Sequence, residues 1–158
     1  MTSSSKRMHE SCIQKRLLRV LEEVDFRRIR ALFEIALGDI EQAQKLIPLT
    51  PTKSRGWTTI YKLHYDALHE LADASLCFDR VRSENHQCLF AALCEMHPEF
   101  EFSWEFFEKV RSTRNGMQYD GKPVDYFGWK AVDVQFELCI KTLKIAIEIK
   151  LIAKDINY

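Results

Sequence analysis

Apolar residues recur every three or four positions through most of this chain, which is the spacing that places side chains on one face of an α-helix. Between residues 10 and 47 the pattern is carried by Leu17, Leu18, Leu21, Val24, Ile29, Leu32, Phe33, Ala36, Ile40, Ala43, Leu46 and Ile47. Proline interrupts it at only a few points, so the links between helices are short. Long amphipathic helices with short links favour an all-α, up-and-down bundle of four or five helices.

Residues that begin or end helices divide this pattern into segments. The segment from 10 to 47 is predicted either as one helix or as two that meet at Asp25, which could cap the second. The later helices are expected at 58–78, at 84–97 behind Ser83 as N-cap, from Ser103 to about Gly116, and after Pro123 and Asp125.

Length and charge restrict the class of protein. A chain of 158 residues fits one domain with a sizeable core. Basic and acidic residues both number 23, so a nucleic-acid site would have to be a local patch rather than a property of the whole surface. No apolar run approaches the roughly 20 residues that span a bilayer, and the N-terminus lacks the apolar core of a secretory signal. We therefore expect a cytoplasmic protein that does not associate with membranes.

The cysteines and histidines show no ligand spacing. The five cysteines contain no CxxC pair and mostly occupy apolar positions of the predicted helices, where we expect reduced thiols that pack as small hydrophobes. His64 and His69 are five residues apart, so on a helix they point away from each other. Neither a metal site nor a cofactor is expected.

The last helix carries more apolar residues than one face can bury in a small bundle. They nearly circle its axis and are Phe136, Ile140, Leu143, Ile145, Ile147, Ile149, Leu151 and Ile152. Exposed apolar surface of this extent usually marks a partner interface. We therefore predict a homodimer that forms through the terminal helices.

The fourth helix closes with two arginines that share a stripe with Phe107, so Arg111 and Arg114 are expected at the rim of the core. A guanidinium is permanently charged and planar and matches two phosphate oxygens at once. Asn115 adds a donor and an acceptor, and Tyr119 follows about one and a third turns after Arg114. These residues predict a phosphate site.

A purely structural interpretation of the same residues stays open. The arginines could pair with Glu108 or with acids on a neighbouring helix, and cations suit the C-terminal end of a helix. The pair 115–116 could simply supply the left-handed conformation that ends it.

Residues 114–121 read RNGMQYDG and precede a long apolar helix. This stretch resembles the signature of the HEPN family, the higher eukaryotes and prokaryotes nucleotide-binding domain. Residues 36–47, ALGDIEQAQKLI, resemble the first core helix of that family, and residues 61–93 resemble its second and third helices. The resemblance implies a HEPN-like helical bundle over residues 25–152. Residues 1–24 would then form an N-terminal helical extension and residues 153–158 a C-terminal tail.

Membership of this family implies a dimer. In its ribonuclease members an arginine and a histidine, separated by a gap of roughly four to six residues, converge from both protomers and cleave RNA without a metal. Such toxins are often encoded beside a minimal nucleotidyltransferase that serves as the antitoxin. In this chain Arg114 and Asn115 match the motif, but Tyr119 stands where the histidine would be. A tyrosine is largely protonated at neutral pH and is a poor base.

We therefore expect Arg114, with Asn115 and Tyr119 nearby and Arg111 as a secondary ligand, to bind RNA or a nucleotide at a dimer cleft. The resemblance implies pairing with a minimal nucleotidyltransferase in a toxin–antitoxin or defence-like system. One alternative is a metal-independent endoribonuclease in which Tyr119, or a histidine from another helix such as His64 or His69, acts with Arg114. Another is a non-catalytic protein-interaction adaptor whose arginines are ion-paired struts.

Overall fold

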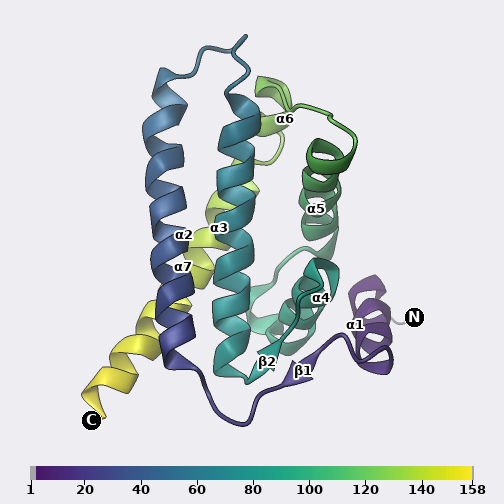
Figure 1. Cartoon of the computed structure of the whole chain (residues 1–158), viewed down its shortest axis with the longest axis vertical. Helices are drawn as coiled ribbons and strands as arrows, with labels where there is room; N and C mark the ends of the chain where they lie inside the picture. The colour runs from purple at the N-terminus through teal and green to yellow at the C-terminus, as the bar shows by residue number, and fades with distance from the viewer. Residues whose placement is uncertain (1–2, 158) are drawn as a thin grey trace.

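The computed structural model describes residues 3–157, and most of them lie in seven α-helices (Figure 1). Residues 1, 2 and 158, at the ends of the predicted extension and tail, lie outside the described part of the chain. In chain order the elements are α1 (Ser4–Gln14), β1 (Arg19–Val20), α2 (Phe26–Leu46), η1 (Ile47–Leu49), α3 (Trp57–Phe78), β2 (Val81–Arg82), α4 (His86–Met96), η2 (Pro98–Phe100), α5 (Trp104–Tyr119), α6 (Tyr126–Lys130) and α7 (Asp133–Ile156).

The helix α3 is the centre of the fold. It runs antiparallel to α2. Helix α7 crosses behind these two helices, and α4 and α5 lie on the side of α3 away from α2 (Figure 1). All residues from Leu71 to Cys77 are buried, because neighbouring helices surround this part of α3 on several sides. A largely helical fold is thus established.

The predicted helix over residues 10–47 is wrong between residues 15 and 24. The helix α1 begins earlier, at Ser4, and ends at Gln14, and Arg16 then adopts a left-handed conformation with φ of 56°. The chain continues as β1, which pairs antiparallel with β2 so that Val20 lies opposite Val81. This small ribbon forms because the turn after α3 presents an open backbone edge, a tertiary contact that helical spacing does not reveal.

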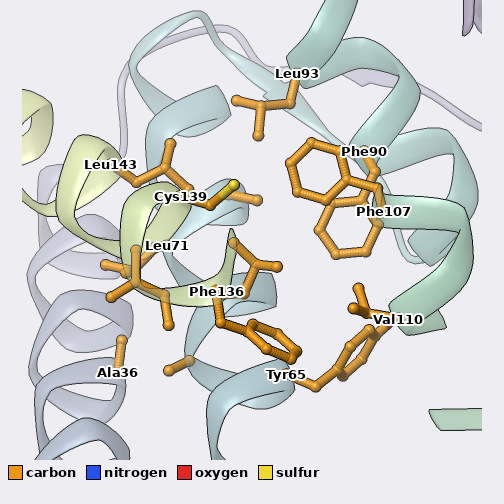
Figure 2. Close-up of a cluster of buried hydrophobic side chains, with 14 of the residues drawn as sticks. Ala36, Tyr65, Leu71, Phe90, Leu93, Phe107, Val110, Phe136, Cys139 and Leu143 are labelled. Atoms are coloured by element: carbon orange, nitrogen blue, oxygen red, sulfur yellow. The ribbon is translucent and has the colours of Figure 1, made fainter. Parts of the chain in front are cut away.

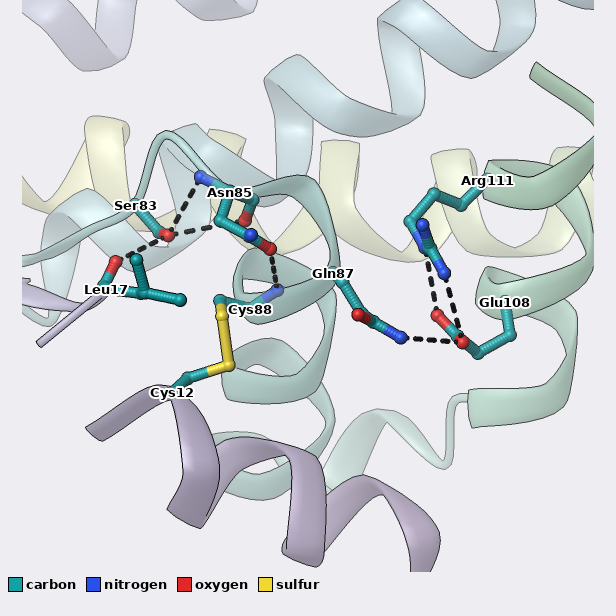
Figure 3. Close-up of a disulfide and its surroundings, with 8 residues drawn as sticks. All are labelled: Cys12, Leu17, Ser83, Asn85, Gln87, Cys88, Glu108 and Arg111. Atoms are coloured by element: carbon teal, nitrogen blue, oxygen red, sulfur yellow. Dashed lines mark hydrogen bonds and ion pairs between the residues drawn. A yellow bond between two sulfur atoms is a disulfide. The ribbon is translucent and has the colours of Figure 1, made fainter. Parts of the chain in front are cut away.

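Two of the three N-cap residues predicted from the sequence are found at the starts of their helices. Asp25 accepts a backbone N–H from the first turn of α2, and Ser103 does the same for α5, as predicted. Ser83 does not cap α4. Asn85 takes that position and accepts the backbone N–H of Cys88, whereas the Ser83 hydroxyl donates to the carbonyl oxygen of Leu17 over 2.8 Å (Figure 3). Ser83 therefore joins the segment before β1 to the start of α4.

The ends of the last helices also differ from the predictions. Gly116 does not weaken α5, which continues to Tyr119 and stops before Gly121, where φ is +62°. Asp125 caps the short helix α6, and α7 is separate from it. Residues 153–156 of the predicted C-terminal tail are helical, because they continue α7.

The core is built mainly from aliphatic and aromatic side chains of α2, α3, α4, α5 and α7 (Figure 2). Phe90 and Phe107 stack with centroids 4.7 Å apart, and Phe136 meets Phe106 edge-on at 5.4 Å. One face of the last helix and the residue before it are buried, namely Val132, Phe136, Cys139, Ile140, Leu143 and Ile147. Its outer face leaves other apolar side chains exposed, namely Val134, Leu138, Ile145, Ile149, Ile152 and Ile156.

Two cysteines contradict the expectation of reduced thiols. Cys12 in α1 and Cys88 in α4 form a disulfide that joins positions 76 residues apart (Figure 3). Cys77, Cys94 and Cys139 remain free. Disulfides are more typical of oxidising compartments, so the cytoplasmic location stays a prediction. Among residues 3–157, none of the helices combines the length and the apolar character needed to cross a bilayer.

Candidate functional site

Arg114 lies where α5 faces α3 and keeps unused hydrogen-bonding capacity. Its guanidinium carbon is 5.9 Å from the centroid of the Tyr65 ring, and its Nε is 3.9 Å from Oδ1 of Asp66. That separation is too long for a hydrogen bond, and Nε is buried without a hydrogen-bond partner among the described residues. The side chain is 23% exposed. The guanidinium is thus held by an aromatic face and a distant carboxylate, while its Nη groups have no hydrogen-bond partner among the described residues and remain available to a ligand.

Two histidines from different helices lie in the same region. His86 is in the first turn of α4, exposed to solvent, and its Nδ1 is 2.9 Å from the Tyr65 hydroxyl. The His69 ring, from α3, lies 3.9 Å from the His86 ring between centroids, and its Nε2 is buried without a partner. We call Tyr65, Asp66, His69, His86 and Arg114 the polar cluster.

Burial and nearby cations make both histidines poor bases. Burial, then the charges of His86 and Arg114, lower the pKa of His69 to about 3. Although His86 is exposed as a residue, its ring packs against His69 and Tyr65, and this desolvation together with the Arg114 charge lowers its pKa. Burial raises the pKa of the Tyr65 phenol, which keeps its proton and can donate it to Nδ1 of His86. At neutral pH the polar cluster therefore contains neutral imidazoles beside one permanent cation.

The acidic residues on the α2 side of the polar cluster are also perturbed. Burial raises the pKa of Asp66 in spite of the Arg114 charge, and burial with the neighbouring Asp66 raises that of Asp39. Burial and the repulsion of three aspartates raise the pKa of Glu70 to about 7, and its Oε2 is buried without a partner. Glu70 is therefore partly protonated near neutral pH, which reduces the negative charge beside Asp39, Asp66 and Asp73.

Arg111 is engaged within its own helix. Its Nε and Nη2 donate to the two carboxylate oxygens of Glu108 over 3.0 and 3.2 Å, and Glu108 also accepts from Gln87 over 2.8 Å (Figure 3). This is the ion-paired arrangement that the sequence left open. Arg111 therefore links α5 to the start of α4, and a ligand would have to compete with Glu108 for it.

The other two predicted ligands make no polar contact with the polar cluster. Asn115 is half-buried beside Arg114, and its side chain forms no hydrogen bond with residues 3–157. Tyr119 is 74% exposed and has no hydrogen bond or ring contact with Arg114. The structure thus brings Arg114 together with histidines of other helices rather than with the tyrosine of its own helix.

His64, one of the two histidines considered as a replacement, is not at this site. Its Nδ1 lies 2.8 Å from the Ile60 carbonyl oxygen, and its ring packs 4.4 Å from Trp129. His86 was missed as a site residue. Its only sequence signal was a position near the start of a predicted helix, which does not indicate what it contacts.

Within residues 3–157, no three His, Cys, Asp or Glu side chains gather in a way that could hold a metal ion. Comparisons of the chain with family profiles, with characterised proteins and with solved structures find no match.

Proposed function

We propose that the polar cluster binds a phosphate-bearing ligand, RNA or a nucleotide, with Arg114 as the cation and His86 as its accessible partner. The observation that supports this most is the guanidinium of Arg114, which is fixed over Tyr65 while Nε has no hydrogen-bond partner. The Nη groups of the same guanidinium also have no hydrogen-bond partner among the described residues, and the side chain is partly exposed, so a phosphate oxygen could accept from them. The resemblance of residues 114–121 to the HEPN signature points to the same ligand class.

The chemistry of the histidines agrees with an anionic ligand. Both rings are neutral when the site is empty, since burial and Arg114 lower their pKa values. A phosphate dianion would supply the opposite charge that favours protonation of His86. Binding would then take up a proton and strengthen as the pH falls toward the ordinary histidine range.

The test is a titration of short fluorescein-labelled single-stranded RNA, and separately of a fluorescent ATP analogue, followed by anisotropy. Arg114→Ala should weaken binding about tenfold or more, because a charge-assisted hydrogen bond contributes about 1.5–3 kcal/mol. Lys109→Ala is the matched control, since Lys109 is an exposed cation of the same helix without a partner among the described residues. Equal affinity for the wild type and Arg114→Ala would rule out the site.

A second candidate function is metal-independent RNA cleavage, and the adjacency of His69 and His86 favours it. His69, which is neutral, would take the proton of a ribose 2′-hydroxyl, whose oxygen attacks the neighbouring phosphorus. The departing 5′-oxygen would take a proton from His86, whose protonated form the bound phosphate favours, and Arg114 would stabilise the charge that develops on the phosphoryl oxygens. The product ends would be a cyclic phosphate and a 5′-hydroxyl.

Cleavage is tested with RNA and EDTA-treated protein, with the ends examined for cyclic phosphate. His86→Gln should reduce the rate about 10²- to 10⁴-fold, the usual cost of losing a general base or acid. His64→Gln, outside the polar cluster, should leave the rate unchanged. Cleavage that survives in His86→Gln would come from a contaminant or from another site.

The assembly we propose is a homodimer formed by the outer face of α7. Leu138, Ile145, Ile149 and Ile152 repeat there at spacings of seven, four and three, which is the seam of a two-stranded helical contact. Light scattering after size exclusion should give a molar mass twice that of one chain. The Ile149→Lys variant should give the molar mass of a single chain. A monomeric wild type would oppose this interface.

The wider context we propose is a toxin–antitoxin or defence-like pair with a minimal nucleotidyltransferase, which rests on the HEPN resemblance. Co-expression with the product of an adjacent gene tests it. A complex that forms while neither RNA nor nucleotide binds would favour the adaptor alternative instead.

A further inference from the structure

A groove of about 770 Å³ is lined by residues of α2, α6 and α7 together with Trp57 and His64 of α3. Its volume is typical of small-molecule sites, which occupy about 300–1,000 Å³. The floor is apolar, with Ile40, Ile47 and Ile140 among the lining side chains. We call it the α2–α7 groove. It is independent of the polar cluster.

Aromatic residues form the walls, and local contacts hold them in place. The Trp57 indole Nε1 donates to the Pro51 carbonyl oxygen over 3.0 Å, and the Tyr126 ring meets Trp57 edge-on at 5.1 Å. Trp129 is buried against His64. Because these rings are fixed without a ligand, the groove is preformed for a flat, largely apolar molecule.

The lining of the groove carries more positive than negative side chains. Lys130 is paired with Asp133 at 2.5 Å, so these two charges offset each other. Lys141 and Lys144 also line the groove, and neither has an ion-pair partner among residues 3–157. Glu137 is the remaining carboxylate of the lining. Two unpaired ammonium groups beside an apolar floor suit a molecule with one anionic group.

His64 adds a directional requirement. A backbone carbonyl only accepts hydrogen bonds, so the 2.8 Å contact with Ile60 places the proton of the ring on Nδ1. Burial lowers the pKa of His64, so the ring is neutral and Nε2 is a hydrogen-bond acceptor. Nε2 has no partner among the described residues, and His64 lines the groove. A ligand that fits would offer an N–H or O–H to this nitrogen.

We propose that the α2–α7 groove binds a small aromatic carboxylate that carries a ring N–H or O–H. The aromatic ring lies on the apolar floor between Trp57 and Trp129. The carboxylate is held by Lys141 and Lys144, and the ring donor binds Nε2 of His64.

The probe is indole-3-acetate, titrated into the nitrogen-labelled full chain and followed by proton–nitrogen NMR. The indole signals of Trp57 and Trp129 should shift. The indole signal of the third tryptophan, Trp104, should not shift, because Trp104 lies outside the groove. Indole-3-ethanol, which lacks the charge, and 1-methylindole-3-acetate, which lacks the donor, should each bind about tenfold more weakly.

Variants separate the two recognition elements. Lys141→Gln with Lys144→Gln should remove the preference for indole-3-acetate over indole-3-ethanol. His64→Phe should remove the preference over the methylated analogue. Lys45→Gln is the charge control, because Lys45 is an exposed cation of α2 outside the lining, and Arg114→Ala should bind the probe as the wild type does.

Three results would overturn the proposal. The first is no binding of indole-3-acetate at millimolar concentration. The second is equal affinity for the charged and uncharged probes. The third is shifts of Trp57 and Trp129 that follow protein concentration instead of ligand, since a second copy of the chain would then occupy the groove.

Discussion

The phenol oxygen of Tyr65 lies 2.9 Å from Nδ1 of His86, and this hydrogen bond joins the middle of α3 to the first turn of α4. The same Tyr65 ring lies beneath the guanidinium of Arg114 from α5. One buried aromatic side chain therefore sets the relative positions of the histidine and the cation. The arrangement of the proposed phosphate site depends on Tyr65 more than on any residue next to Arg114 in sequence.

Replacing Tyr65 tests this dependence. Tyr65→Phe keeps the ring under Arg114 but removes the hydroxyl that orients His86. We expect a loss of about 1 kcal/mol in the free energy of unfolding, the usual net value of a hydrogen bond, measured by urea denaturation. RNA affinity should fall about fivefold, which corresponds to the same energy. Tyr119→Phe is the control and should leave stability unchanged, because the Tyr119 hydroxyl is exposed.

Glu70 should make the fold less stable as the pH rises. Its pKa in the folded protein is about 7 against an ordinary 4.5, so the folded state holds the proton more tightly than the unfolded state. The penalty for ionising it is absent below pH 4.5 and grows to its full value above pH 7. Glu70→Gln should be more stable than the wild type by about 1–2 kcal/mol at about pH 8, after allowance for solvent screening.

At about pH 4 the Glu70→Gln difference should vanish, since both proteins are then uncharged at this position. Thermal or urea unfolding at the two pH values provides the measurement. A difference that is the same at both would mean that packing, not ionisation, distinguishes the two side chains.

His69 should make the fold less stable as the pH falls, which is the opposite direction to Glu70. Its pKa falls from 6.5 to about 3 in the folded protein, so between these values the unfolded state binds the proton and the folded state does not. Stability should therefore decrease as the pH falls from 6.5 toward 3. His69→Gln should flatten this decrease. Because Glu70 acts in an overlapping range, the comparison is cleanest in a Glu70→Gln background, and an unchanged slope there would contradict the buried, neutral state of His69.

The disulfide between Cys12 and Cys88 should stabilise the fold through the long loop it closes. Its partners are 76 residues apart. Reducing a disulfide that closes such a loop should lower the free energy of unfolding by about 2–4 kcal/mol. Urea unfolding with and without a phosphine reductant measures the difference, and hydrogen exchange should show α1 opening first. Cys12→Ala should not respond to the reductant, whereas Cys94→Ala, which removes a free thiol, should respond as the wild type does.

Local patterns in the sequence determined most of the helical fold. The three-to-four spacing predicted α3 almost to the residue, Asp25 and Ser103 cap the helices they were expected to cap, and Phe136 faces the core as its stripe required. The pairing of Arg111 with Glu108 was foreseen as an alternative, because the two residues are three apart on one helix. The caps and the ion pair join residues only three positions apart, and the helical period alone shows which side of a helix is apolar.

Only the tertiary structure decided which residues surround Arg114. His86 precedes it by 28 positions and belongs to another helix, so its approach depends on how α4 and α5 each pack against α3. The same holds for the β1–β2 ribbon and for the bond between Cys12 and Cys88. Helical periodicity shows which side of a helix is buried, but the angle and register between packed helices follow from the fit of all their side chains together.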